Sequence, residues 1–293
     1  ATEIARGCAS SGWDLSVIAA HAWMLGMFPA EAQEEIWRDD PGATIATSFL
    51  PKGGKAVRHG DGLRLNGRWG FSSGVDYCGS AMLMVSLPAD GGGAPELAFA
   101  LVPKKDYTIE DTWFVTGLTG TGSNDIVIES AEVPAHRILP VMETRGGPTP
   151  GSAVNPGYLY QLPLFATFPF NLIGAALGAS QGALDILLDG MAERTSVAHV
   201  RLAEQQSVQL RISEAAAEIH SAHAIIDRHC DDINKWGRAG RQPDALSRTI
   251  YRRDLGYAAM LCSRALERIF PLLGGRGLAA GDPIQRAWRD VHA

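Results

Sequence analysis

The sequence has few cysteines and lacks the short motifs that most often carry cofactor or nucleophile chemistry. Its 293 residues include four cysteines that lie far apart and form no CxxC pair: Cys8, Cys78, Cys230 and Cys262. This spacing excludes a disulfide framework of the small secreted type and predicts reduced thiols in a cytoplasmic protein. The sequence also has no P-loop, no GxGxxG segment after a strand and no GxSxG elbow.

Positive charge is neither abundant nor clustered. The formal net charge is -6 and there is no polybasic run, so neither nucleic acid nor a membrane is predicted as a partner. Charged residues are missing between Arg145 and Asp185, but Pro163, Pro169 and Asn171 interrupt this apolar stretch. A spanning helix needs about 20 predominantly apolar residues, so the stretch is predicted to be a buried helix entered through a Pro-rich loop.

Metal ligands are not arranged as a di-iron site in a helical bundle requires, because that site uses two Glu-x-x-His pairs. The helical part of the sequence has none. His220 and His223 stand three residues apart, but no carboxylates accompany them at the required spacing. A surface or capping role is predicted for both, and no metal site is predicted.

Three regions differ in the period of their apolar residues. Residues 1–41 show the roughly 3.6-residue period of helices. Residues 42–141 contain short alternating runs between turns at 61–62, 90–93 and 104–106, which predict an antiparallel β domain of sandwich or barrel type. Residues 142–293 are rich in Ala and Leu from Leu162 onward and predict an antiparallel helical bundle.

Hydroxyls, aromatics and glycines gather at predicted strand ends of the β domain. They fall in three segments: Thr47-Ser48-Phe49, Trp69-Gly70-Phe71-Ser72-Ser73-Gly74, and residues 117–124 with Gly120, Thr121 and Ser123. An isoalloxazine ring needs an apolar platform, close backbone approach and a few hydrogen-bonding groups near its nitrogens. Each segment alone is better explained as an ordinary turn. Together, with Trp69 or Phe71 to stack on the ring, they indicate a flavin site.

Residues 69–74 resemble the Trp-Ile-Thr-Asn-Gly segment of acyl-CoA dehydrogenases, whose Thr contacts flavin N5, and Ser72 falls on that position. Residues 133–134, 273–277 and 289–290 are similar to later landmarks of the same superfamily. The resemblance implies an α+β fold with an N-terminal helical unit, a central antiparallel β domain and a C-terminal four-helix bundle, assembled as a homotetramer. It also implies that roughly the first hundred residues and a short tail of that fold lie outside this sequence.

A finer resemblance is to the oxygenase components of two-component aromatic hydroxylases, and it lies in residues 71–74, 117–125 and 288–292. This branch implies an enzyme that receives reduced FMN or FAD from a separate NAD(P)H-flavin reductase. With O2 it would form a C4a-hydroperoxyflavin and hydroxylate a phenolic or other aromatic substrate. The missing nicotinamide-binding fingerprint agrees with a separate reductase.

The same resemblance implies two catalytic residues. Ser72 would hydrogen-bond flavin N5, and His21 would help to deprotonate or orient the substrate phenol, which a His can do near neutral pH because its free pKa is about 6.5. From the residues alone, a satisfied core histidine is the more frequent case for a His in an apolar helix, and only the resemblance makes the catalytic interpretation of His21 equally good. A second active-site His is implied about one helical turn past His292.

Other site residues are assigned by their place in the superfamily pattern. Arg194 and Arg201 lie at positions where proteins of this superfamily often contact the phosphate or adenine end of the flavin. A solvated surface arginine is an interpretation at least as good for either residue. Gly274 and Gly275 fall where a neighbouring subunit's cofactor is approached. The substrate pocket is predicted around the loop at 146–164, with these candidate residues: Trp23, Tyr158, Tyr160, Phe165 and His292.

Two further functions stay open from the sequence. One is an FAD-dependent acyl-CoA dehydrogenase, with oxidation at nitrogen or sulfur as a related alternative. The other is a non-catalytic assembly module, which would neither bind reduced flavin nor consume O2 with it.

Overall fold

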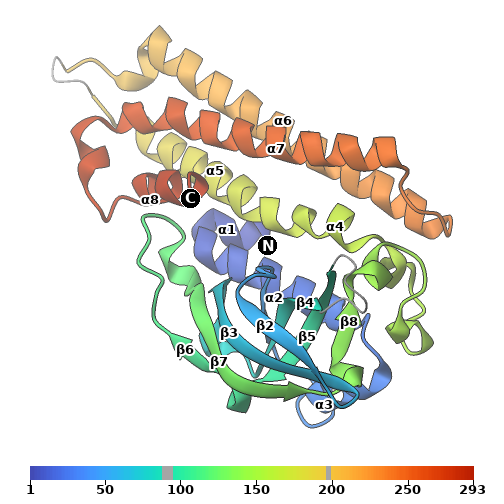
Figure 1. The fold of residues 1–293 in the computed structure, drawn as a ribbon. Coiled ribbons are helices and arrows are strands. Elements are labelled where there is room, and N and C mark those ends of the chain that lie inside the picture. Colours follow the sequence, from blue (N-terminus) through green and yellow to red (C-terminus); the bar gives the residue numbers. More distant parts are fainter. Residues whose placement is uncertain (88–94, 196–198) are drawn as a thin grey trace.

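Two layers of β-sheet lie at one end of the molecule and a bundle of long helices lies at the other (Figure 1). The computed structural model describes residues 1–87, 95–195 and 199–293, so the turn predicted at 90–93 lies outside the described residues. The N-terminal helices α1 (Thr2–Gly7) and α2 (Ala9–Leu25) lie between the two layers and the bundle, and α3 (Ala30–Trp37) follows them. The mixed helical and sheet architecture predicted from the sequence is confirmed.

The sandwich consists of two four-stranded sheets. One sheet has the order β1 (Ile45–Ser48), β4 (Ser80–Leu87), β5 (Glu96–Pro103) and β8 (Ile138–Pro140). The other has the order β2 (Gly54–His59), β3 (Gly62–Ser72), β7 (Asn124–Val133) and β6 (Thr108–Glu110). The prediction of a wholly antiparallel domain is wrong at one place, because β1 and β4 pair in parallel. Between β1 and β4 the chain forms the β2–β3 hairpin in the opposite sheet. It then returns to the first sheet, where β4 runs in the same direction as β1.

The first sheet is buried on both faces. Along β4, Leu83 and Val85 point into the sandwich core, whereas Met82 and Met84 pack with Phe28 and other residues of the N-terminal helices. Double burial explains why residues 81–85 are continuously apolar instead of alternating with polar residues.

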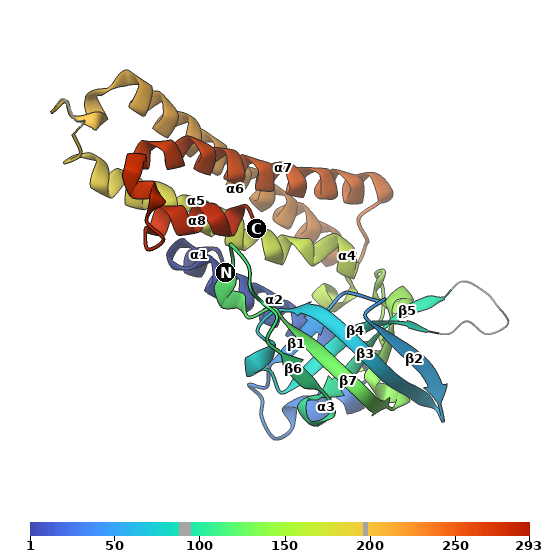
Figure 2. The same cartoon turned by 60° about the vertical axis from the view of Figure 1, so that its left-hand side comes forward.

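The bundle is formed by α5 (Pro169–Met191), α6 (Gln206–Arg238), α7 (Ala245–Ile269) and the short α8 (Pro283–Val291). A single turn, α4 (Leu164–Thr167), precedes α5, and a 3-10 segment, η10 (Phe270–Leu278), joins α7 to α8. Asp244 and Asp282 cap α7 and α8 by accepting backbone N–H bonds, which satisfies amides that a helix start leaves free. Figure 2 shows α5 and α8 facing the sheets and α6 and α7 on the outer side.

The stretch Leu164–Met191 is long and apolar enough to cross a membrane, and 61% of its most apolar window is buried inside the protein. Its glycines allow α1 to approach closely. A Cβ at Gly178 would lie 2.1 Å from the carbonyl oxygen of Thr2, and one at Gly182 equally close to that of Arg6. The apolar stretch therefore packs against α1, as expected for the buried helix predicted from the sequence.

Candidate active site

His21 lies on α2 with its ring against β1 and is only 2% exposed. Its Nδ1 is 2.7 Å from the carbonyl oxygen of Ile45, and its Nε2 is 2.8 Å from the hydroxyl of Thr47. Because a carbonyl oxygen only accepts, Nδ1 carries the proton and Nε2 accepts from Thr47. Burial lowers the pKa of His21 to about 4, so the ring is neutral near pH 7.

This environment corrects one sequence expectation. The sequence predicted that His21, with an ordinary pKa, would act as a base near neutral pH. Its pKa is instead lowered by burial, and both ring nitrogens are already hydrogen-bonded. Neither ring nitrogen of His21 is therefore left free for a further hydrogen bond. The imidazole fixes the Thr47 hydroxyl rather than acting as an exposed base.

An aromatic cluster encloses the His21 ring. Phe168 stacks on it with ring centroids 6.3 Å apart, and the rings of Phe49 and Phe168 have centroids 5.0 Å apart. Phe165 meets Phe49 edge to face at 6.2 Å. These rings exclude water from the Thr47–His21 pair, which strengthens its electrostatic interactions.

Strand β3 carries a bulge at the predicted flavin site. Trp69 pairs with Ile126 and Ser72 with Asn124, so residues 70 and 71 stand opposite the single residue 125. Phe71 has a φ of 59°, which is strained for a bulky residue. The bulge reverses the side-chain alternation: Phe71 is 67% exposed and Ser72 is fully buried.

The Ser72 hydroxyl is buried and has no hydrogen-bond partner in the part of the chain that the structure describes. A buried hydroxyl without a partner costs about 1–3 kcal/mol, and such a cost is commonly tolerated where a ligand supplies the partner. Ser48 stabilises the bulge, because its Oγ donates to the Gly70 carbonyl at 2.7 Å.

The other predicted hydroxyls form a directed chain. Thr121 donates to the Leu118 carbonyl at 3.0 Å, so Ser123 must donate to Thr121 and Ser73 to Ser123, each at 2.7 Å. The indole N–H of Trp13 completes the chain by donating to Ser73 at 3.0 Å. All three hydroxyl protons are used inside the chain, which fixes the loop at 117–124 beside the bulge. Gly120 lets this loop pack on α2, since a Cβ there would lie 3.1 Å from that of Ser10.

Trp69 does not lie at this surface. It is fully buried in the sandwich core, where its indole donates to the Met84 carbonyl at 3.0 Å. The exposed ring beside the bulge is Phe71, which meets Trp113 edge to face at 5.7 Å. Of the two aromatics predicted to stack on a flavin, the structure thus leaves only Phe71 exposed.

The residues predicted for the phosphate or adenine end lie elsewhere. Arg194 donates to the Leu273 carbonyl at 3.1 Å, next to Gly274 and Gly275, and Arg201 is exposed. This group sits past the C-terminal end of α5, whereas Phe168 and His21 lie at its start. A 23-residue helix is about 34 Å long, so within one chain the two groups stand far apart.

Three of the predicted substrate residues line one or the other of two separate cavities. Trp23 and Tyr160 line one of about 490 Å³ between α2 and α6, and Tyr158 packs beside it, donating to Asn234 at 2.9 Å. Trp23 is two residues from His21, which places it on the opposite face of α2. Phe165 lines a different cleft, of about 1050 Å³. His292 contacts Glu267 and the Trp288 carbonyl and lines neither cavity.

Three residues at the site were missed by sequence reasoning. Trp13 anchors Ser73, and Asp290 accepts from the Leu118 amide at 2.7 Å, which holds the loop at 117–124 against α8. Asp14 has a buried carboxyl oxygen that makes no hydrogen bond with a described residue, and burial raises the pKa of this carboxyl to about 7. Only Asp290 had a sequence signal, as half of the Arg-Asp landmark.

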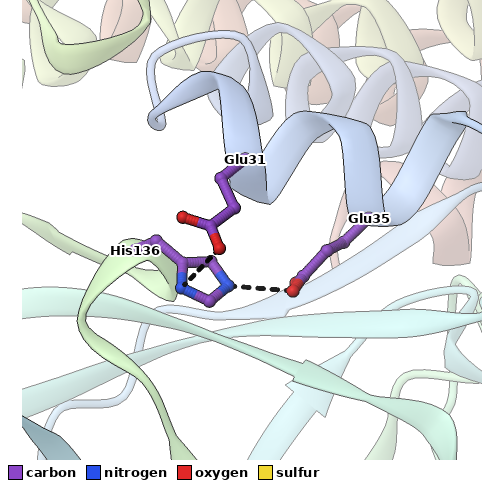
Figure 3. Close-up of side chains that lie close together, drawn as sticks. All are labelled: Glu31, Glu35 and His136. Carbon is purple, nitrogen blue, oxygen red and sulfur yellow. Dashed lines mark hydrogen bonds and ion pairs between the residues drawn. The ribbon is translucent and has the colours of Figure 1, made fainter.

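Among the described residues one group could hold a metal ion: Glu31 and Glu35 on α3 with His136 (Figure 3). The two carboxylates flank opposite sides of the imidazole, at 3.7 Å from Nδ1 and 2.9 Å from Nε2. Arg137 pairs with the second oxygen of Glu35 at 2.5 Å. With a cation already present, the group is best described as an ion-pair network between α3 and the β domain.

Comparison with known proteins agrees with this geometry. Residues 172–293 match the family described as acyl-CoA dehydrogenase, C-terminal domain. The chain is 37% identical to the oxygenase component of the FADH(2)-dependent resorcinol hydroxylase of Rhizobium sp. (strain MTP-10005), covering 99% of this chain and 73% of that protein. It is 33% identical to the flavin-dependent monooxygenase oxygenase subunit HsaA of Rhodococcus jostii, covering 99% and 76%.

Solved structures show the same relationship. The 3-HSA hydroxylase of Rhodococcus sp. RHA1 superposes with a TM-score of 0.93 at 32% identity, over 99% of this chain and 75% of that one. XiaF from Streptomyces sp., in complex with FADH2 and glycerol, superposes with a TM-score of 0.89 at 26% identity, over 99% and 73%. The relationship predicted from residues 71–74, 117–125 and 288–292 is confirmed: the chain belongs to the oxygenase components of flavin-dependent aromatic hydroxylases, within the acyl-CoA dehydrogenase superfamily.

Proposed function

We propose that the chain binds a reduced flavin, FMN or FAD, at the β3 bulge and hydroxylates a phenolic ring held at the Thr47–His21 pair. The observation that carries the proposal is the Ser72 hydroxyl, which is fully buried and has no partner among the described residues. Beside it lie a strained backbone at Phe71 and the fixed loop at 117–124. These features fit a flavin ring, which needs a hydrogen-bonding group at N5 and close backbone approach.

The chemistry that bound reduced flavin supplies is activation of O2. Overall, O2, two electrons and two protons convert the aromatic substrate into a hydroxylated product and water. The chain's part is to hold Ser72 Oγ within reach of the ring nitrogens and to keep the surroundings dry. Water exclusion matters because it suppresses unproductive loss of the activated oxygen as peroxide.

Thr47 and His21 act on the substrate in this proposal. Because the Thr47 proton is donated to Nε2, its oxygen is left to accept from a phenolic O–H. A phenol held in this way gains oxyanion character, which activates its ring toward an electrophilic oxygen. His21 stays neutral and holds the hydroxyl in place.

A separate reductase supplies the reduced flavin. The sequence has no nicotinamide-binding fingerprint, and the relatives are named as oxygenase components. We expect the chain alone to leave NADH unoxidised. With chemically reduced FMN or FAD, O2 and a phenol, it should form a hydroxylated product. Product formation from NADH without any reductase would contradict this part of the proposal.

The active assembly is a cytoplasmic homotetramer in this proposal. The Arg194–Gly274 group lies about one α5 length from His21, and in this proposal it serves the flavin of a neighbouring copy. Apolar side chains are exposed at that end of the bundle, among them Leu188 at 47% and Leu278 at 85%. Such exposure indicates an interface. Light scattering on the purified protein should give four times the chain mass, and a monomer would contradict the arrangement.

A further inference from the structure

The cleft of about 1050 Å³ differs in charge from the rest of the protein. Three arginines line it, Arg145 from the segment after β8 and Arg248 and Arg252 from α7, and no carboxylate is among its lining residues. The inner wall is apolar, with Phe165, Pro169 and Leu255 among its residues. The chain as a whole has a net charge of -6, so this arginine cleft is a local basic feature on an acidic protein.

In the described part of the chain none of Arg145, Arg248 and Arg252 makes a hydrogen bond or an ion pair through its side chain. Other arginines of α7 are paired: Arg253 with Asp254 at 2.7 Å and Arg264 with Glu218 at 2.8 Å. Asp244, four residues before Arg248, accepts from the amide of Ser247. This hydrogen bond and the charges of Arg241 and Arg248 hold the pKa of the Asp244 carboxyl below its usual value.

Helix geometry explains why the arginines converge on the cleft. Arg248, Arg252 and Leu255 stand at i, i+4 and i+7 on α7, so they share one face. Leu255 belongs to the apolar wall of the cleft, and Arg248 and Arg252 form the basic rim of the cleft. An amphipathic anion, apolar at one end and charged at the other, matches this face.

The cleft adjoins the site proposed for the substrate. Phe165 lines it and also contacts Phe49, which contacts Phe168, the ring stacked on His21. None of its lining residues belongs to the β3 bulge or to the loop at 117–124. The arginine cleft thus borders the aromatic cluster around His21 and not the β3 bulge.

We propose that the arginine cleft binds a carboxylate of the substrate, so that the preferred substrate is an aromatic carboxylic acid with a phenolic hydroxyl. The inference rests on the proposed function and names the substrate class of that site. A guanidinium fork recognises a carboxylate through two parallel hydrogen bonds. The basic rim would also raise the association rate of such anions in a salt-dependent way.

Equilibrium binding of matched phenols to the full chain tests the inference. 4-Hydroxyphenylacetate and its methyl ester differ in the negative charge, and calorimetry gives both dissociation constants without turnover. We expect the acid to bind at least tenfold more tightly than the ester. Arg252→Ala and Arg248→Ala should each weaken the acid about tenfold and leave the ester unchanged, with partial rescue by Arg252→Lys.

Arg253→Ala is the matched control, because it removes the same charge from the same helix on another face. Equal affinities for acid and ester, or an equal loss in this control, would overturn the inference. So would arginine variants that change only the oligomeric state. If the acid binds as expected but is never hydroxylated, the proposed function fails while the arginine cleft stands.

A phosphate is the other anion that the guanidinium groups could hold, and flavin mononucleotide is its source. Anaerobic titration with reduced FMN and reduced riboflavin separates the two cases. Arg248→Ala and Arg252→Ala should leave both flavin affinities unchanged. Weakened FMN binding with unchanged riboflavin and phenol binding would assign the cleft to the flavin phosphate and overturn the inference.

Discussion

The hydroxyl of Thr47 donates to Nε2 of His21 across 2.8 Å, joining β1 to α2 inside a shell of phenylalanine rings. Thr47→Val keeps the volume and removes the hydroxyl, so Nε2 is left buried without a partner. The free energy of unfolding should fall by about 1–3 kcal/mol. Product formed per reduced flavin consumed should fall as well, since the phenol loses its acceptor.

Thr47→Ser is the control for that change, because it keeps the hydroxyl and should retain most of the coupling. Denaturant unfolding gives the stability, and quantifying product against flavin oxidised gives the coupling. A valine variant that couples as well as the serine variant would remove Thr47 from the reaction.

The neutral, buried state of His21 makes stability depend on pH in one direction. Its folded pKa, about 4, lies below the unfolded value of about 6.5, so the unfolded chain binds the extra proton in that window. The stability is fully present above pH 6.5 and is lost as the pH falls toward 4, by about 3 kcal/mol in all. Urea unfolding of wild type and His21→Gln between pH 4 and 7 should show a shallower loss in the variant, and parallel curves would contradict the assignment.

Asp14 has the opposite pH dependence. Burial raises its folded pKa to about 7 from an unfolded value near 3.8, so the folded state holds the proton between those values. Its contribution is present below pH 3.8 and is lost as the pH rises through 7. Because the side chain is only partly buried, the loss is about 1–2 kcal/mol.

Asp14→Asn should therefore be more stable than wild type at pH 8 by that amount and equal to it at pH 4. Urea unfolding at the two pH values measures the difference. A variant that is no more stable at pH 8 would show that the carboxyl is solvated or paired.

Asp290 connects α8 to the loop at 117–124, and this contact should control flavin binding. Asp290→Ala leaves the Leu118 amide, whose residue has a φ of 54°, without its acceptor. We expect reduced-flavin affinity to fall about tenfold and stability to fall by about 1–2 kcal/mol. Asp290→Asn retains an acceptor oxygen and should restore most of both. Anaerobic flavin titration is the measurement, and an alanine variant with wild-type affinity would show that the loop holds its shape without α8.

Sequence patterns predict much of this fold because its elements have clear periods. The helical regions at both ends and the strands between them follow from apolar spacing and turn residues. The parallel pairing of β1 with β4 does not follow from spacing, because it depends on which sheet the intervening hairpin joins. The separation of Trp23 from His21 depends on how α2 is rotated, because the two residues differ by only two positions in the sequence.

The β3 bulge shows why the site itself was predicted only in part. Period-2 alternation would place Trp69 and Phe71 on one face, and the extra residue in the bulge places Phe71 outside and Ser72 inside. A bulge depends on pairing with β7, which one strand's sequence does not specify. The lowered pKa of His21 and the raised pKa of Asp14 have the same origin, since burial is set by the packing of distant elements.

The most direct test of the central claim is the yield of hydroxylated phenol per reduced flavin oxidised in Ser72→Ala. Ser213→Ala, at an exposed position on α6, is the matched control. We predict that the Ser72 variant consumes reduced flavin and O2 yet releases most of the oxygen as hydrogen peroxide, while the control hydroxylates as wild type does. A Ser72→Ala protein with unchanged product yield and flavin affinity would contradict the placement of the flavin at the β3 bulge.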